Sequence, residues 1–322
     1  MKFKAYLTDD GINLLTHRIL SALEKIGKIC HLYLNRHHLF FLHNLLSPDG
    51  LHSVAQFNHR SLFHDYRITS QNDDRIAFSI DLSLLHRALR SILAIYNNSR
   101  DINSHGVQIK LVKKSPPHNN HPTPYLTFEA NGYTSAVVQD VPISKPLSRT
   151  DVHDLQIAVE NSQDMPATLV KSPELISLQN LVDRMKHVGD VIEVSITKYG
   201  DLNLYISTSL VTLGTEFENL VILGERVDKA AAAMGEERLR GKNRIERAVE
   251  RGDAMSVQVN VKHLVKCLEY SCLAKPDSAF FGIGRHGSCL VVIFEFFVPG
   301  TRQTDKSISL HCRLPVLDPG SN

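Results

Sequence analysis

The sequence lacks the features that mark several large classes of protein. Its formal net charge is only +2 over 322 residues, so no strongly basic tail indicates nucleic-acid binding, and any contact with DNA must come from locally arranged cations. No apolar run approaches the ~20 residues that a membrane-spanning helix needs. The opening MKFKAYLTDD has no long apolar core of the kind that signal peptides contain. We therefore expect an intracellular, reduced, soluble protein that does not bind membranes.

Cysteine is also scarce, and the five that occur show no paired framework. Cys30, Cys289 and Cys312 lie in apolar, strand-like sequence, as buried thiols do. Cys267 and Cys272 share one helical segment without a second pair of ligands nearby, which argues against zinc. We expect no metal and no cofactor.

Motifs of common enzymes are missing as well. HExxH, GxSxG and Walker-type GKS or GKT sequences do not occur. FGIGRHGSCLVVIF, which contains Gly282, Gly284 and Gly287, reads as strand, turn, strand, whereas a phosphate-binding loop needs a helix after its glycines. Several histidines fall in expected strand ends and turns without a matching set of acidic or cysteine residues: His37, His38, His52, His59 and His64. The sequence therefore predicts no catalytic residues.

The first forty or so residues show the pattern on which the chain is built, which is strand, helix, strand, strand. The strands are MKFKAYL and the two within KICHLYLNRHHLFFLH, and the helix is DDGINLLTHRILSALEKIG. Apolar residues recur in this helix at intervals of three and four: Ile12, Leu15, Ile19, Leu23 and Ile26. This spacing places five side chains on one face, which we expect to pack on a sheet.

The rest of the first half continues with strands and a second amphipathic helix over Leu82–Tyr96, for which Asp81 is a plausible N-cap. Asn131-Gly132 predicts a tight turn between the last two strands, and the prolines of Lys113–Pro124 predict a loop. The predicted strands are Gly50–Phe57, Asp65–Thr69, Arg75–Ile80, Gly106–Val112, Tyr125–Ala130 and Thr134–Val141.

The same order of elements returns after an offset of about 160 residues, a period that indicates one duplicated domain and not a solenoid. The second helix pair is expected over Leu175–Met185 and Val261–Cys272. The matching strands lie within DVIEVSITKYGDLNLYIS and over Leu210–Phe217, Ala254–Asn260, Ser278–Ile283, Cys289–Phe296 and Ser307–Leu314. Because short connections favour antiparallel sheets, we predict an α+β protein with two duplicated domains, each with two helices packed on antiparallel sheets.

Domain boundaries follow from the breaks in this pattern. We expect domain 1 over residues 1–141, a proline-bounded interdomain connector over 142–166, and domain 2 over 167–322. Domain 2 contains a charged insertion at 218–253, which we interpret as a solvated loop that could include a frayed helix. A role of its basic stretch in partner binding or nuclear import is the alternative.

Four stretches of the chain together carry a resemblance to a known family: MKFKAYLTDDGINLLTHRILSALEKIGKICHLYL, FSIDLSLLHRALRS, VVQDVPI and GDLNLYISTSLVTLGTEF. Through them, nearly the whole chain resembles the Hus-type subunit of the nine-one-one checkpoint clamp, a member of the DNA-clamp superfamily. The resemblance implies a non-catalytic subunit that supplies two of six domains in a closed ring around duplex DNA, together with two other, Rad-type subunits. It also implies a clamp loader, checkpoint and repair partners, and a nuclear location, with the cytoplasm left open before assembly. The insertions Lys113–Pro124 and Glu218–Asp253 depart from shorter members.

A ring around DNA predicts cations on the polar faces of all four helices. The face opposite each apolar stripe carries the following candidates for the DNA channel: His17, Lys25, Arg87, Arg90, Arg184, His187, Lys262 and Lys266. Glu24, Asp183 and Glu269 lie among or beside them. Such contacts would be independent of DNA sequence. The alternative is that helix surfaces commonly carry lysine and arginine.

The resemblance implies that Thr134–Val141 and Leu210–Phe217 lie at sheet edges. They are candidates for contacts between subunits, because unpaired edges accept another strand. The candidate interface residues are Val137, Val141, Val211, Leu213 and Phe217, although the same side chains would also fit the intramolecular core. By analogy with other clamps, the apolar connector residues would offer a docking site for partner peptides, or they would pack on the chain's own sheet: Leu155, Ile157 and Val159.

Two other functions remain open at this point. One is a homo-oligomeric processivity clamp, and the other is an α+β hydrolase that uses histidine and acidic residues from loops. The subunit order in a ring, the face that binds a loader or repair enzymes, self-association of the free chain and the roles of insertions 113–124 and 218–253 are not predicted by the sequence.

Overall fold

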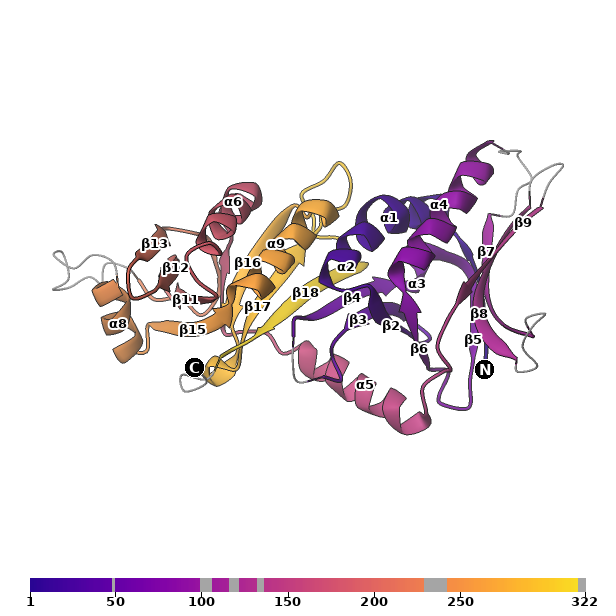
Figure 1. Ribbon diagram of the computed structural model, residues 1–322, viewed down its shortest axis with the longest axis horizontal. Coiled ribbons are helices and arrows are strands. Elements are labelled where there is room, and N and C mark those ends of the chain that lie inside the picture. The colour runs from indigo at the N-terminus through magenta and orange to yellow at the C-terminus, as the bar shows by residue number, and fades with distance from the viewer. Residues whose placement is uncertain (48–49, 99–105, 116–121, 132–135, 229–241, 318–322) are drawn as a thin grey trace. The chain divides into compact units, whose positions relative to one another are not determined.

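The computed structural model describes residues 1–47, 50–98, 106–115, 122–131, 136–228 and 242–317. It divides into two compact units (Figure 1). Unit 1 comprises Met1–Leu46, Val54–Glu160 and Lys306–Ser309, and unit 2 comprises Ser47–Ser53, Asn161–Asp305 and Leu310–Asn322. Within the described residues, none of the helices combines the length and apolar content required to span a membrane.

Unit 1 contains a five-stranded antiparallel sheet in the order β5-β1-β7-β8-β9 and four further neighbouring strands in the order β4-β3-β2-β6. The first sheet is formed by β1 (Lys2–Leu7), β5 (Phe63–Thr69), β7 (Val107–Lys114), β8 (Thr123–Asn131) and β9 (Ala136–Pro142). The other strands are β2 (Ile29–Leu34), β3 (His38–His43), β4 (His52–Asn58) and β6 (Ile76–Asp81). The helices are α1 (Asp9–Leu14), the π-helix η1 (Leu15–Ile19), α2 (Leu20–Ile26), α3 (His59–Leu62), α4 (Leu82–Asn98) and α5 (Arg149–Ser162).

The first predicted helix is one continuous element, made of α1, a single π-helical stretch and α2. Thr8 caps its start, since the Thr8 side chain accepts a hydrogen bond of 2.8 Å from the Gly11 amide. All five residues of the predicted apolar stripe, from Ile12 to Ile26, are buried. The three-and-four spacing therefore predicted the core-facing side correctly despite the π-helical stretch.

The second helix of unit 1, α4, begins where the sequence predicted. The Asp81 carboxylate accepts hydrogen bonds from the amides of Ser83 (2.8 Å) and Leu84 (3.2 Å). Hydrogen bonding by Ser83 contributes most to a lowered pKa of Asp81. The stripe residues Leu82, Leu85, Leu89, Ile92 and Leu93 are buried, while the side chain of Tyr96 lies outside the described residues.

Unit 2 repeats this topology strand for strand. Its five-stranded part has the order β14-β10-β16-β17-β18 and its four-stranded sheet has the order β13-β12-β11-β15. The strands are β10 (Thr168–Lys171), β11 (Val191–Thr197), β12 (Leu202–Ser207), β13 (Thr212–Phe217), β14 (Ile222–Gly224), β15 (Ala254–Asn260), β16 (Ser278–Ile283), β17 (Cys289–Glu295) and β18 (Ile308–Pro315). The helices are α6 (Leu175–Met185), α8 (Lys242–Glu250), α9 (Val261–Ala274) and the 3-10 turn η2 (Arg285–Gly287).

Each unit has one layer of paired helices. In unit 1, α2 packs against α4, and in unit 2, α6 packs against α9. The buried residues of α6 are Leu178, Val182 and Met185, so part of the predicted stripe, including Leu175 and Leu181, is only half-buried. The repeat of two helices over antiparallel sheets agrees with the duplication predicted from the sequence.

Three helices lie in segments where the sequence predicted no ordered helix: the short α3, between the predicted strands Gly50–Phe57 and Asp65–Thr69, and two longer helices. Helix α5 occupies most of the expected connector, and α8 forms the end of the charged insertion. The loop expected over Lys113–Pro124 is shorter, because β7 extends through Lys114 and β8 starts at Thr123. Residues 116–121 and the predicted turn at Gly132 lie outside the described residues.

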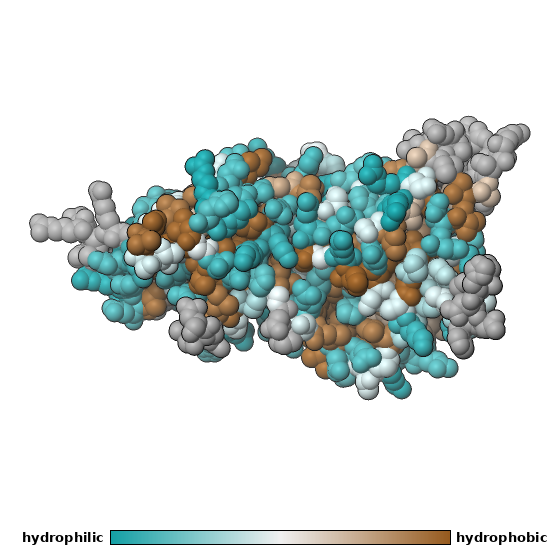
Figure 2. All heavy atoms as spheres, viewed as in Figure 1, coloured by the Kyte–Doolittle hydropathy of each residue, from teal (hydrophilic) through white to brown (hydrophobic). Residues whose placement is uncertain are grey.

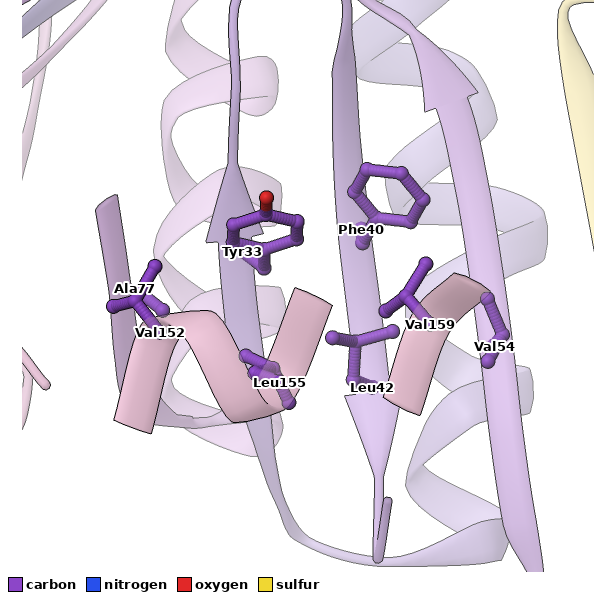
Figure 3. Packing of buried hydrophobic residues seen from close by; sticks show 8 residues of the cluster. All are labelled: Tyr33, Phe40, Leu42, Val54, Ala77, Val152, Leu155 and Val159. Atoms are coloured by element: carbon purple, nitrogen blue, oxygen red, sulfur yellow. The ribbon is translucent and has the colours of Figure 1, made fainter. Parts of the chain in front are cut away.

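Helix α5 packs on strands of its own unit (Figure 3). Its apolar residues Val152, Leu155 and Val159 lie against a buried patch on four strands: Tyr33, Phe40, Leu42, Val54 and Ala77. The helix begins with reciprocal hydrogen bonds of 3.2 Å between Ser148 and Asp151, which is a capping box. The side of the sheet away from α1, α2 and α4 is therefore covered within unit 1 (Figure 1).

Candidate nucleic-acid interface

The four cationic candidates of unit 1 lie on its helix layer and are exposed. His17 lies on η1, Lys25 on α2, and Arg87 and Arg90 on α4. Because η1 and α2 both contact α4, these side chains belong to one surface. Lys25, Arg87 and Arg90 take part in no ion pair with the described part of the chain, so their charges are available to a ligand.

Glu24, which dilutes the positive charge of the first helix in the sequence, is engaged across the helix pair. Its carboxylate lies 3.2 Å from His86 Nδ1, and the other ring nitrogen of His86 lies 2.8 Å from the carbonyl oxygen of Thr16. Both atoms that face the His86 ring are acceptors. The arrangement ties α2 and η1 to α4 and directs the acidic group toward the imidazole.

The four candidates of unit 2 are likewise exposed on one helix layer. Arg184 lies on α6, His187 lies just after it, and Lys262 and Lys266 lie on α9. Asn260 caps α9, and its side chain accepts a 2.9 Å hydrogen bond from the Lys262 amide. This cap fixes the first turn, on which Lys262 is presented.

Acidic residues near these cations form weak, exposed pairs. Lys262 lies 3.0 Å from Asp190, and both side chains are about 70% exposed, so solvent screens the pair. Asp183 pairs with Lys186 at 2.9 Å. Asp190 was not identified from the sequence, because it precedes β11 and is not part of a helical face. Asp190 comes close to Lys262 only because the fold places the loop before β11 beside the start of α9.

The strands predicted to mediate subunit contacts lie at sheet edges. Strand β9 is the last strand of the five-stranded sheet in unit 1, and β13 is the last strand of the four-stranded sheet in unit 2. Val141 is 2% exposed, and Val137, Leu213 and Phe217 are half-buried. These side chains therefore contribute to the cores of their own units, so the main chain of each edge is what remains for pairing with another chain.

The loop before β13 is the more apolar of these two surfaces. Leu210 is 92% exposed and Val211 is 52% exposed, and Figure 2 shows hydrophobic surface in the region of β13. By contrast, hydrophilic atoms cover α6 in the same view. An apolar loop beside an unpaired strand is typical of a surface that contacts another protein.

The three connector residues separate into two groups. Leu155 is fully buried and Val159 is 4% exposed, whereas Ile157 is 42% exposed. Leu155 and Val159 pack on the chain's own sheet, the alternative that the sequence left open, because α5 brings them to one face. Among these three, only Ile157 is accessible to a partner.

The other chemical groups singled out in the sequence do not converge. Among the described residues, no group of three or more His, Cys, Asp or Glu side chains is arranged to hold a metal ion. The five cysteines are free thiols, and all but Cys272 are buried. Gly282 to Gly287 lie on β16 and in η2, which leads directly into β17.

Comparison with known proteins matches this chain to one family over most of its length. The model of the family described as "Hus1-like protein" matches residues 1–305. Checkpoint protein HUS1 of Homo sapiens is 27% identical over 224 residues, which cover 68% of this chain and 74% of that protein. The checkpoint protein hus1 homolog of Dictyostelium discoideum is 25% identical over 222 residues, with the same coverage of 68% and 74%.

A solved structure supports the same fold. The chain is similar to the proliferating cellular nuclear antigen of Entamoeba histolytica, with a TM-score of 0.58 and 8% sequence identity. The match covers 98% of this chain and 99% of that one. The α+β DNA-clamp fold predicted from the sequence is therefore confirmed, although a likeness at this identity concerns the fold alone.

Proposed function

The chain belongs to the Hus1-like family, and from this premise we propose that it is one of three different subunits in a ring-shaped clamp that encircles duplex DNA. Its curated relatives are named checkpoint proteins, and it shares a fold with a clamp protein. It is a checkpoint clamp protein without catalytic activity. The heterotrimeric ring, the DNA in its channel and the role as a scaffold are the proposal.

One observation carries the assignment of the DNA channel. Each helix of the two duplicated pairs presents at least one exposed lysine or arginine on its solvent side, in a chain with a net charge of +2: Lys25, Arg87, Arg90, Arg184, Lys262 and Lys266. Contacts of this kind attract phosphates without reading bases. We expect weak association that depends on salt, with a log–log slope of about 0.9 for each phosphate contact.

The test is a charge reversal on the helix layers. Replacing Arg87, Arg90, Lys262 and Lys266 by glutamate should abolish retention of the assembled clamp on DNA and reduce the salt slope. A matched control reverses four exposed cations outside these helices: Lys145, Arg149, Arg285 and Arg302. Unchanged retention of the helix variant, or equal loss in the control, would show that the helix layers do not face DNA.

Assembly is proposed to use the two sheet edges, β9 and β13, each pairing with an edge of a different subunit. The exposed Val211 supports a partner contact near β13. Co-expressed with its two Rad-type partners, the chain should elute as a complex of three different chains, and Val211→Asp should weaken that complex. A homotrimer formed by this chain alone would favour a self-assembling processivity ring instead.

We further propose nuclear action, loading by a dedicated clamp loader and recruitment of checkpoint and repair proteins, as the family implies. Of the three apolar residues in the predicted connector, Ile157 on α5 is the exposed one, so it is the candidate for contact with a recruited protein. Ile157→Asp should reduce partner capture by the assembled clamp while leaving its assembly unchanged. Unaltered capture would exclude α5 as a docking site.

A further inference from the structure

A row of polar side chains crosses the four-stranded sheet of unit 2 on the side away from α6 and α9. Four residues lie in register on neighbouring strands: Ser256, Ser195, Asn203 and Glu216. Ser195 and Asn203 are fully buried. The hydroxyls of Ser195 and Ser256 are 2.6 Å apart, but neither amide atom of Asn203 has a hydrogen-bond partner. A buried amide without partners is unfavourable.

The insertion helix α8 covers this side of the sheet. It contacts β15 and β11 and lies away from α6 and α9 (Figure 1). Its apolar contribution is small. Ile245 and Ala248 are its buried residues, and Ala248 packs with Tyr199 and Ala254. A helix of nine residues has little stability of its own, so these few contacts must hold it in place.

The main attachment of α8 is ionic. The Arg244 guanidinium lies 3.0 Å from Asp201, 3.3 Å from Glu216 and 3.3 Å from Glu218. Asp201 is fully buried, and the Arg244 side chain is 16% exposed. One cation thus faces three carboxylates. The Nε atom of Arg244 is buried without a hydrogen-bond partner.

One carboxylate of the acidic site is also held by its own sheet. The Tyr205 hydroxyl donates a 2.5 Å hydrogen bond to Glu216. A Cβ atom at position 214 would collide with the Tyr205 ring, so Gly214 allows that ring to lie across β13. Burial, and next the bond to Glu216, raise the pKa of Tyr205. Glu216 is therefore held in place by a contact within the sheet as well as by Arg244.

We propose that this side of the sheet is a docking surface for an arginine-bearing helix of a partner protein, and that α8 occupies it in cis as a displaceable cover. The partner helix would place an arginine among Asp201, Glu216 and Glu218 and a short apolar residue against Tyr199. A longer helix would also offer polar groups to Asn203, which α8 leaves unpaired. The surface is the face of the sheet and not its edge, so the proposal is independent of ring assembly.

The test uses the full chain and a peptide with the sequence of residues 240–252, RGKNRIERAVERG. In Arg244→Glu, amide hydrogen exchange at residues 242–250 should accelerate, while exchange in β11 and β12 stays slow. The labelled peptide should bind this variant. Since a tethered segment competes at an effective concentration in the millimolar range, the wild-type chain should bind the peptide at least about tenfold more weakly.

Two controls accompany this test. A peptide in which glutamate replaces the arginine that corresponds to Arg244 should not bind. In the chain, Ile245→Ser removes an apolar contact of α8 without adding charge, and this variant should also bind the unaltered peptide. Arg244→Lys should retain part of the protection of α8. If the peptide binds neither variant although α8 exchanges rapidly in both, or binds wild type and variants equally, the docking surface does not exist.

Discussion

The outward sides of the two duplicated sheets differ in chemistry at corresponding positions. In unit 1, Tyr33 on β2 pairs with Ala77 on one side and with Phe40 on the other. In unit 2, the residues in the same register are Ser195, Ser256 and Asn203. Leu155 and its apolar neighbours on α5 pack on the apolar row of unit 1. Helix α8 covers the polar row of unit 2, where Arg244 forms an ion pair with Asp201.

The inward sides of the same strands are alike. Leu32 and Phe41 of unit 1 and Val194 and Leu204 of unit 2 are all buried beneath the helix pair. The inward residues are therefore alike in the two units, while the outward residues differ together with the helices that cover them. The apolar packing of α5 depends on buried area and is little affected by salt. The ionic attachment of α8 weakens when its charges are screened or removed.

The largest loss of stability is expected when the apolar packing of α5 on its sheet is disrupted. Leu155→Ala should lower the free energy of unfolding by about 4 kcal/mol, because a fully buried leucine leaves a cavity. Urea denaturation followed by circular dichroism measures the loss. Ile157→Ala on the same helix is the control and should change stability by less than about 0.5 kcal/mol. Equal effects of the two variants would mean that α5 is not packed as described.

Acid should destabilise both units through one buried histidine in each. Burial lowers the pKa of His43 in unit 1 and of His311 in unit 2 to about 4. Unfolded histidine binds its proton near pH 6.5, so the stabilising effect is complete above that pH and is lost as the pH falls toward 4. Each residue should contribute up to about 3 kcal/mol of this loss.

Single variants assign that loss to a unit. His43→Gln should remove the acid-dependent part from unit 1 alone, and His311→Gln from unit 2 alone, in urea denaturation at pH 7 and pH 4.5. Hydrogen exchange of β3 and β18 reports the two units separately. A pH dependence that persists in the double variant would place the responsible groups elsewhere.

The ionic cover should respond to charge and salt where the apolar one does not. Arg244→Ala should lower the stability of α8 by about 1–3 kcal/mol, because Asp201 is left buried without its guanidinium. Rising salt should reduce the difference between wild type and variant, since screening weakens the wild-type contact. Hydrogen exchange at residues 242–250 measures both effects. For Leu155→Ala, no such salt dependence is expected.

The smallest effect concerns the starts of α4 and α6. Asp81→Ala should destabilise unit 1 by about 1 kcal/mol, because the carboxylate caps two backbone amides. Glu174, the N-cap residue of α6, makes no side-chain capping bond, so Glu174→Ala should change stability by less than about 0.5 kcal/mol. Thermal unfolding of both variants checks the contrast. Equal losses would imply that helix dipoles, and not caps, decide these termini.

Much of the fold and the exposure of the cations could be predicted, because these features depend on residues within single helices. The stripe from Ile12 to Ile26 and the cap at Asp81 depend on residues that are close together in sequence, so their spacing is sufficient. The exposed cations opposite each stripe, such as Arg87 and Lys262, follow from the same periodicity. Helix α5 was missed although Val152, Leu155 and Val159 have helical spacing, because prolines and polar residues around them favoured a connector.

The amino-acid sequence alone determined the duplicated order of strands and helices, the inward face of each helix and the cations on the opposite face, since these follow from periodicity within single elements. Which helix packs on the outward face of each sheet, α5 in unit 1 and α8 in unit 2, was decided only by the tertiary structure. Nothing near Arg244 in the sequence indicates that it meets Asp201 and Glu216. Asp201 lies in the turn before β12 and Glu216 lies on β13, and the two become neighbours only through the pairing of β12 with β13. Long-range pairing of this kind decides which polar groups are buried together, and sequence spacing does not encode it.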